Sequence, residues 1–233
     1  MNKLIRFIIK TITYTFSKKR YLVLGDSHSM VFDYPLFRIQ FPFKYFDVNP
    51  VQGATISGIE NPNSKTNAHN IFKAKLRHTK KVNKIILLIG EVDTGFVIWY
   101  KAEKHNIDEK IILNETIKKY KSFINYCGRY APVIVVSAPL PTIKDDNNWG
   151  EIANLRKEIK ANQQKRTQLT LDFNKSIKMF CVESNIEFID LDKYSLGQDG
   201  LVHPYLLNRN KNDHHYDKRK YSFLLGKNIR KKL

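Results

Sequence analysis

Five short apolar runs, separated by longer and more polar stretches, constrain the fold of this chain more than any other feature. They lie at residues 21–24, 45–48, 84–89, 133–137 and 187–191. Each run is short and rich in β-branched or aromatic side chains, which is typical of strands that are buried on both faces. We therefore predict five strands of a sheet that is covered on both sides.

The stretches between these runs have helical periodicity. Residues 108–127 form one predicted helix, residues 150–182 form one or two, and residues 216–233 contain a last amphipathic helix. In the first of these, one face carries the apolar residues Leu113, Ile117, Tyr120 and Ile124. Alternating strands and helices predict an α/β fold, a three-layer α/β/α sandwich around a mostly parallel five-stranded sheet.

The first 19 residues differ from the rest of the chain because basic residues interrupt their apolar positions at near-helical spacing. Residues 1–19 are predicted to be a basic amphipathic segment, and residues 20–233 a single domain. The segment is too charged to span a bilayer, which needs about 20 apolar residues. It suits either a membrane surface or a helix packed on the domain, and both alternatives stay open.

The chain is strongly basic, with 40 lysines and arginines against 22 acidic residues and a formal net charge of +18. Such a charge attracts polyanions, and an anionic membrane surface is one expected partner. The lysines are scattered and form no nucleic-acid reader motif, so no specific nucleic-acid partner is predicted. Cys127 and Cys181 have no disulfide or metal spacing, which favours a cytoplasmic location. Peripheral attachment at the inner face of the membrane is one of the two alternatives left open for the N-terminal segment.

The first polar stretch that could carry chemistry is "LGDSHS", residues 24–29, at the end of the first apolar run. Here Asp26, Ser27 and His28 stand on a corner between a strand and a predicted helix. A serine at such a corner is exposed above the sheet, and its own N–H can face a developing oxyanion. The alternative is a turn in which these small polar residues only cap the helix.

Two further stretches follow the second and third strands. In "ATISG", residues 54–58, Gly58 allows the backbone to approach a ligand and present an N–H, or it belongs to a plain flexible loop. In "LIGEVD", residues 88–93, Glu91 and Asp93 follow a buried strand directly. They are either site residues at the ligand-binding edge of the sheet or solvated, helix-capping acids.

The fourth stretch, "NKNDHHYDKRKY" at residues 210–221, is dense in donors and acceptors. An imidazole oriented by a carboxylate, such as His215 with Asp213, can act as a general base toward a serine hydroxyl. Histidine and aspartate are also metal ligands. Because adjacent histidines such as His214 and His215 point in different directions, we predict no metal ion and no other cofactor.

The order and setting of these four stretches resemble the SGNH, or GDSL, hydrolase family, over roughly residues 20–230. The resemblance implies that Ser27 is the nucleophile and His215 the catalytic histidine, with Asp213 orienting it. It also implies that the N–H groups of Ser27 and Gly58 form the oxyanion hole. Five further residues are predicted to support the site, namely Asp26, His28, Glu91, Asp93 and His214.

Two positions depart from the family pattern. The oxyanion asparagine of the third block is replaced by Val92, whose side chain donates no hydrogen bond. Either another group, such as His28 or Asn61, takes its place, or the enzyme is slow, or the site no longer works as a hydrolase. In the last block the expected aspartate position falls on Asn212, with Asp213 one residue late. A second stretch, "DGLVHP" at residues 199–204, is also similar to that block and makes His203 a reserve candidate for the catalytic histidine.

The chain resembles divergent family members found with bacterial surface-polysaccharide synthesis genes. This resemblance implies a serine-dependent acyl-ester hydrolase or O-acyltransferase that forms an acyl-enzyme, with a carbohydrate or an acylated small molecule as substrate. The alternative is a catalytically degenerate protein of the same fold that binds an anionic glycan, a lipid surface or nucleic acid. Val92 and the displaced Asp213 favour this alternative, whereas the intact Gly25-Asp26-Ser27 sequence opposes it.

Overall fold

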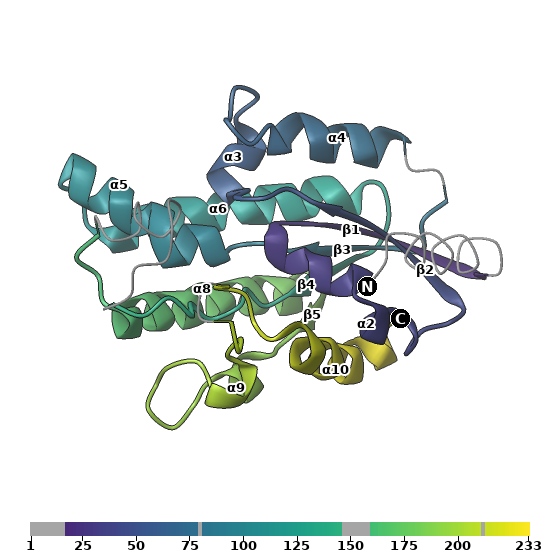
Figure 1. Ribbon diagram of the computed structural model, residues 1–233. Coiled ribbons are helices and arrows are strands. Elements are labelled where there is room, and N and C mark those ends of the chain that lie inside the picture. Colours follow the sequence, from purple (N-terminus) through teal and green to yellow (C-terminus); the bar gives the residue numbers. More distant parts are fainter. Residues whose placement is uncertain (1–16, 79–80, 146–158, 211–212) are drawn as a thin grey trace.

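The computed structural model describes residues 17–78, 81–145, 159–210 and 213–233. Its centre is a five-stranded sheet in which every pair of neighbouring strands is parallel (Figure 1). The strand order is β2-β1-β3-β4-β5. The strands are β1 (Lys19–Gly25), β2 (Lys44–Pro50), β3 (Lys84–Leu88), β4 (Val133–Val136) and β5 (Glu187–Ile189). All five predicted strands are confirmed, as is the α/β sandwich.

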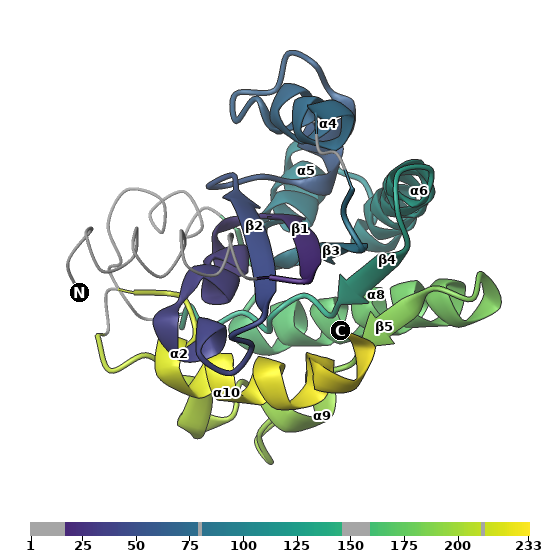
Figure 2. The same ribbon diagram turned by 90° about the vertical axis from the view of Figure 1, so that its right-hand side faces the viewer.

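Helices cover both faces of the sheet (Figure 2). One face is covered by α3 (Ile56–Glu60), α4 (Ala68–His78), α5 (Ile98–His105), α6 (Glu109–Gly128) and α8 (Gln163–Glu183). The other face is covered by the 3-10 helix η1 (Ser27–Asp33), α2 (Pro35–Arg38) and α10 (Lys218–Ile229). The shorter elements are the π-helical turn η2 (Asp93–Val97), α9 (Asp192–Ser195), η3 (Pro204–Leu206) and η4 (Arg230–Lys232).

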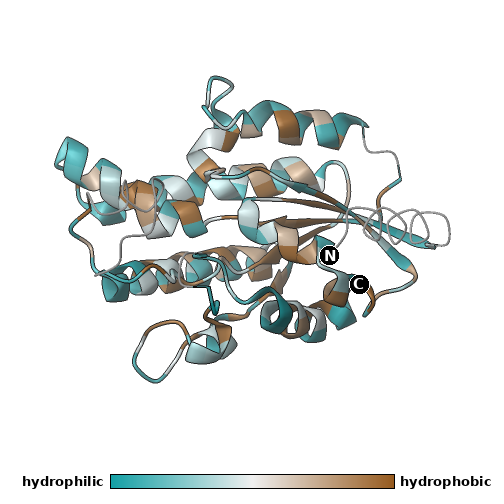
Figure 3. Cartoon of the chain, in the orientation of Figure 1, coloured by the Kyte–Doolittle hydropathy of each residue, from teal (hydrophilic) through white to brown (hydrophobic). Residues whose placement is uncertain are grey.

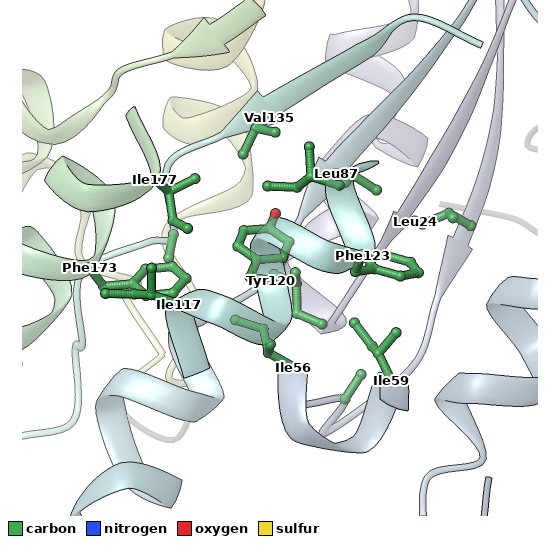
Figure 4. Close-up of a cluster of buried hydrophobic side chains, with 14 of the residues drawn as sticks. Leu24, Ile56, Ile59, Leu87, Ile117, Tyr120, Phe123, Val135, Phe173 and Ile177 are labelled. Carbon is green, nitrogen blue, oxygen red and sulfur yellow. The ribbon is translucent and has the colours of Figure 1, made fainter. Parts of the chain in front are cut away.

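The two-residue alternation of the strands divides the core into two clusters. In β3, Ile85 and Leu87 belong to the first cluster, whereas Ile86 and Leu88 belong to the second. Figure 4 shows part of the first cluster, where the rings of Tyr120 and Phe173 stack with centroids 5.8 Å apart. The central strands β3 and β4 are hydrophobic along nearly all of their length, whereas the edge strand β2 carries Lys44, Asp47 and Asn49. The helices are hydrophilic on their outer faces (Figure 3), as a doubly covered sheet requires.

The helix predictions agree with the structure where it describes the chain. The apolar stripe of residues 108–127 lies buried in α6, and residues 216–233 contain α10. Of residues 150–182, the structure describes one helix, α8, and the part before residue 159 lies outside the described residues. Residues 1–16 of the predicted N-terminal segment also lie outside them. Within the described ranges, no helix is long and apolar enough to cross a membrane.

The strand order reverses next to β1. The chain passes from β1 outward to β2 and then returns to β3 on the other side of β1. In sheets of this kind, ligands bind at the carboxyl ends of the strands beside such a reversal. The residues that follow β1, β2 and β3 are therefore brought to one rim, and three of the four polar stretches found in the sequence lie there.

Candidate active site

The corner between β1 and η1 places Ser27 at the rim of the sheet. Asp26 is buried and caps η1, because its Oδ1 accepts a hydrogen bond from the His28 N–H at 2.9 Å. Ser27 is the first residue of η1 and is partly exposed. The first N–H groups of a helical turn have no acceptor within it, so the Ser27 N–H is suited to an oxyanion formed at its own side chain.

The structure brings Ser27, His215 and Asp213 together, although Ser27 and His215 are 188 residues apart in sequence. His215 Nε2 lies 2.8 Å from Ser27 Oγ, and His215 Nδ1 lies 2.7 Å from Asp213 Oδ1. With the proton of the neutral imidazole on Nδ1, facing the carboxylate, Nε2 accepts from the serine hydroxyl. This is the arrangement that a nucleophile, a base and an orienting carboxylate require.

The short spacing between Asp213 and His215 is accommodated by a local turn. Asp213 Oδ1 accepts from the His215 backbone N–H at 3.1 Å as well as from the ring. One carboxylate oxygen therefore fixes both the backbone and the imidazole of the residue two positions later. This explains how an aspartate displaced by one residue from the family pattern still reaches the histidine.

The surroundings of His215 keep its imidazole neutral. Burial lowers the pKa of His215 below its ordinary value of 6.5, and the nearby His28 lowers it further, against the opposing effect of Asp213. For Asp213, burial alone would raise the pKa, but hydrogen bonds from the His215 side chain and backbone bring the net pKa below its usual value. At neutral pH the pair is thus an uncharged base beside a carboxylate.

His28, which follows Ser27 in the sequence, repeats the pattern of His215. Its Nδ1 lies 3.1 Å from Asp26 Oδ1, the same oxygen that accepts from its backbone N–H. The His28 ring is buried, and its centroid lies 4.8 Å from that of His215. Two Asp-x-His units therefore meet near the serine, and the predicted supporting residues Asp26 and His28 are its neighbours in the sequence.

This proximity predicts a pH effect. With neutral His215 as the base, the acidic limb of the kcat/KM profile is expected below pH 6.5. The His28→Asn variant removes an electrostatic effect that lowers the His215 pKa, so that pKa is expected to rise and the acidic limb to move to higher pH. Ester hydrolysis measured across pH checks this, with His105→Asn, at the exposed end of α5, as control. An unmoved limb in His28→Asn would refute the coupling.

The other two histidines considered in the sequence have different places. The His214 ring packs on that of His215 with centroids 4.2 Å apart, and the His214 carbonyl accepts from the Thr142 hydroxyl. His203 is exposed, and its Nδ1 accepts from the Tyr205 N–H at 3.1 Å at the start of η3. The reserve assignment of His203 as catalytic base is therefore wrong, because the position beside Ser27 is held by His215.

The oxyanion hole differs from the prediction. The Gly58 N–H lies inside α3 and donates to Thr55 Oγ1 at 2.9 Å, because Thr55 caps that helix. This bond occupies the Gly58 N–H, so the structure corrects its assignment as an oxyanion donor. Val92 supplies no side-chain donor, and Asn61 ends α3, where its Oδ1 accepts from the Asn63 N–H. Of the two predicted backbone donors, Ser27 and Gly58, only the Ser27 N–H remains in the described structure.

The acids of the third stretch have separate roles. Asp93 is fully buried and accepts from the Ile56 N–H at 2.9 Å, which ties η2 to the start of α3. Burial raises the pKa of Asp93 to about 7, against this hydrogen bond. Glu91 is also buried, and its charge acts to raise the His215 pKa. Asp93 therefore positions the backbone at the start of α3, whereas Glu91 acts electrostatically on His215.

Among the described residues, no group of three or more histidine, cysteine, aspartate or glutamate side chains is arranged to hold a metal ion. The three histidines near Ser27 instead pack ring against ring. The side chains that surround the site on the α10 side, notably Tyr221, were not predicted from the sequence. In the sequence Tyr221 is one of several apolar residues of the last helix, and no signal distinguishes it from a core residue.

Several solved structures similar to this chain are described as esterases or lipases. A GDSL-like lipase from Bacteroides thetaiotaomicron has a TM-score of 0.60 at 15% identity, covering 97% of this chain and 96% of its own. The aryl esterase of M. smegmatis has a TM-score of 0.62 at 15% identity, covering 93% and 100%. An acetyl xylan esterase has a TM-score of 0.59 at 12% identity, covering 92% and 99%.

Neither a protein-family model nor a curated protein matches the sequence. The structural likeness is therefore to distant proteins, but it extends over nearly the whole of each chain. It confirms the resemblance to the SGNH/GDSL hydrolases at the level of the fold.

Proposed function

We propose that this protein is a serine-dependent acyl-ester hydrolase or acyltransferase. The observation that carries the proposal is the chain of two hydrogen bonds from Ser27 Oγ through His215 to Asp213 at the carboxyl rim of the sheet. The esterases and the lipase among the similar structures support the same reaction class. A partly exposed serine with a neutral, oriented imidazole is suited to nucleophilic attack on a carbonyl carbon.

In the first half-reaction, Ser27 Oγ attacks the ester carbonyl carbon while His215 Nε2 takes the hydroxyl proton. The Ser27 N–H donates to the carbonyl oxygen as it becomes an oxyanion. When the carbon–oxygen bond to the alcohol breaks, His215 returns the proton to the departing oxygen, and the acyl group stays on Ser27. In the second half-reaction, an acceptor hydroxyl attacks that ester, His215 takes its proton, and the proton passes back to Ser27 Oγ.

The acceptor decides between the two activities. Water gives an esterase, and a sugar hydroxyl gives an O-acyltransferase. A carbohydrate substrate is supported by the acetyl xylan esterase among the similar structures and by the sequence resemblance to members found with polysaccharide synthesis genes. Because the oxyanion hole has few hydrogen-bond donors, we expect slow turnover, since each missing donor costs about 100- to 1,000-fold in rate.

The second candidate function is binding without catalysis. The oxyanion hole has few donors, because the Gly58 N–H is hydrogen-bonded to Thr55 and position 92 is a valine. This favours a protein of the same fold that no longer catalyses ester cleavage. Its net charge of +18 suits an anionic glycan, lipid surface or nucleic acid as ligand.

Acetate release separates these functions. Wild-type protein is expected to release acetate from acetylated xylo-oligosaccharides and p-nitrophenol from p-nitrophenyl acetate, and the Ser27→Ala variant should release neither. Adding unacetylated oligosaccharide to the p-nitrophenyl acetate reaction distinguishes transfer, which yields acetylated sugar, from hydrolysis, which yields acetate. If folded wild-type protein releases no more product than Ser27→Ala from either compound, the binding function is the better account.

A further inference from the structure

Basic residues lie at the amino-terminal edge of the sheet, which is the edge opposite the active site. Lys19 and Lys44 are the first residues of β1 and β2, and they are paired in the register of the sheet. Because parallel strands start at the same edge, both lysines lie one strand length, about 20 Å, from the corner that carries Ser27. Glu187, an acid at the start of β5, is already paired with Lys84 at 2.9 Å. The part of this edge formed by β1 and β2 therefore has an excess of positive charge.

The end of α10 brings a further cation to this edge. Arg230 Cζ lies 5.2 Å and Lys44 Nζ 5.4 Å from the ring centroid of Phe41. Burial lowers the pKa of Lys44, and the positive charges of Lys19 and Arg230 lower it further. Lys19 Nζ donates to the Leu233 carbonyl oxygen at 2.8 Å, whereas Lys44 and Arg230 form no ion pair with any described residue. Like charges held this close repel one another, so the cluster favours an anion from outside the protein.

The loop between α2 and β2 adds exposed apolar side chains to this basic surface. Ile39 is 61% exposed and Phe43 is 68% exposed. A tight turn holds Phe43 beside the cations, because the Lys44 N–H donates to the Phe41 carbonyl at 3.1 Å. Single exposed apolar residues are common on proteins. Two of them within five residues, next to a cluster of cations, are the combination found on surfaces that bind anionic membranes.

We propose that an amino-edge surface of this protein docks on a membrane rich in anionic lipids. The amino-edge surface consists of Lys19, Ile39, Phe43, Lys44, Arg230 and the exposed Lys231. Its cations contact the lipid headgroups, and its two apolar side chains enter the boundary between headgroups and acyl chains. The active site, at the opposite edge of the sheet, then faces away from the membrane. The inference goes beyond the proposed function and does not depend on it.

The apolar side chains favour a membrane over a soluble polyanion. A nucleic acid or an anionic glycan would neutralise the cations, but it offers no extended apolar region to Ile39 and Phe43. A membrane removes the apolar surface of both side chains from water in addition to neutralising the charges. The chain that precedes Lys19, in which basic and apolar residues alternate at near-helical spacing, also joins the domain at this edge.

Flotation of the full-length protein with vesicles tests the proposal. Wild-type protein is expected to bind vesicles of phosphatidylcholine mixed with phosphatidylglycerol, and not vesicles of phosphatidylcholine alone. Arg230→Gln combined with Lys231→Gln should weaken binding by about 25-fold, about 5-fold for each charge. Phe43→Ala, which keeps every charge, should weaken it by about 10-fold. The matched control is Lys104→Gln with Lys165→Gln, which removes two exposed charges from the other end of the molecule and should change binding by less than about 2-fold.

Three outcomes would overturn the proposal. The first is that wild-type protein does not bind the mixed vesicles. The second is equal binding by the Arg230/Lys231 variant and its control, since attachment would then depend on the overall charge or on residues 1–16. The third is unweakened binding by Phe43→Ala, which would mean a purely electrostatic attraction such as that to a soluble polyanion.

The orientation on the membrane is tested separately with a fluorophore that brightens in an apolar environment. It is attached to Pro42→Cys, in the exposed loop of the amino-edge surface, or to Tyr205→Cys, in η3 beside the start of α10. The native Cys127 and Cys181 are buried and stay unlabelled. Mixed vesicles are expected to raise the fluorescence at position 42 and to leave it unchanged at position 205. A rise at position 205, or none at position 42 in bound protein, overturns the orientation.

Discussion

The His215→Ala variant is expected to lose about 10⁴-fold or more in kcat/KM for a p-nitrophenyl ester, with its fold intact. The imidazole is the only group hydrogen-bonded to Ser27 Oγ in the described structure, at 2.8 Å, so its loss leaves the hydroxyl without a base. Members of such a unit act together, and removing either the serine or the histidine costs nearly as much as removing both. Steady-state kinetics with the purified variant measures the loss.

The double variant gives the sharper readout. Ser27→Ala combined with His215→Ala is expected to be no slower than either single variant, because each already removes the whole nucleophilic route. Losses that multiply in the double variant would mean that the two side chains act independently. A loss of less than 10-fold in His215→Ala would place the base elsewhere.

The Gly25→Ala variant is expected to lose more than about 3 kcal/mol of unfolding free energy, above the usual cost of an overpacked core. A Cβ on Gly25 would lie 2.0 Å from the carbonyl oxygen of Leu88 in the neighbouring strand. Because that atom belongs to the backbone, relief requires β1 to separate from β3. The same carbonyl accepts from the Asp26 N–H at 3.2 Å, so the corner that carries Ser27 would move as well.

Urea denaturation followed by circular dichroism measures this effect. Gly128→Ala is the matched control, since a Cβ there meets no atom within 4 Å and alanine favours the end of α6. Its stability should stay within about 1 kcal/mol of wild type, on the stabilising side. Equal midpoints for Gly25→Ala and Gly128→Ala would show that β1 and β3 are not packed as described.

The strands and the main helices were predictable because their periodicity is set locally by what each segment buries. The position of the site at the carboxyl edge of the sheet was also predictable, since parallel strands place their carboxyl ends together whatever the loops contain. The meeting of Ser27 with His215 was predictable from the family resemblance alone. No local pattern relates two residues 188 positions apart.

The oxyanion hole and the surroundings of Tyr221 could not be predicted in the same way. Whether the Gly58 N–H faces a ligand or its own helix cap depends on the conformation of Thr55, which the family pattern does not specify. Tyr221 has the spacing of a core residue, and nothing in the sequence shows that its buried hydroxyl makes no hydrogen bond within the described residues. Both features depend on side-chain placement within the folded molecule.

Reaction with a fluorophosphonate probe, followed by mass spectrometry of the digested protein, tests the nucleophile most directly. The account predicts one adduct, on Ser27, that persists in Ser29→Ala, is absent from Ser27→Ala and forms far more slowly in His215→Ala. Ser29 is a suitable control because it is buried and its hydroxyl donates to the Asp26 carbonyl at 2.6 Å. An adduct on any other residue, or no adduct on folded wild-type protein, would contradict the account.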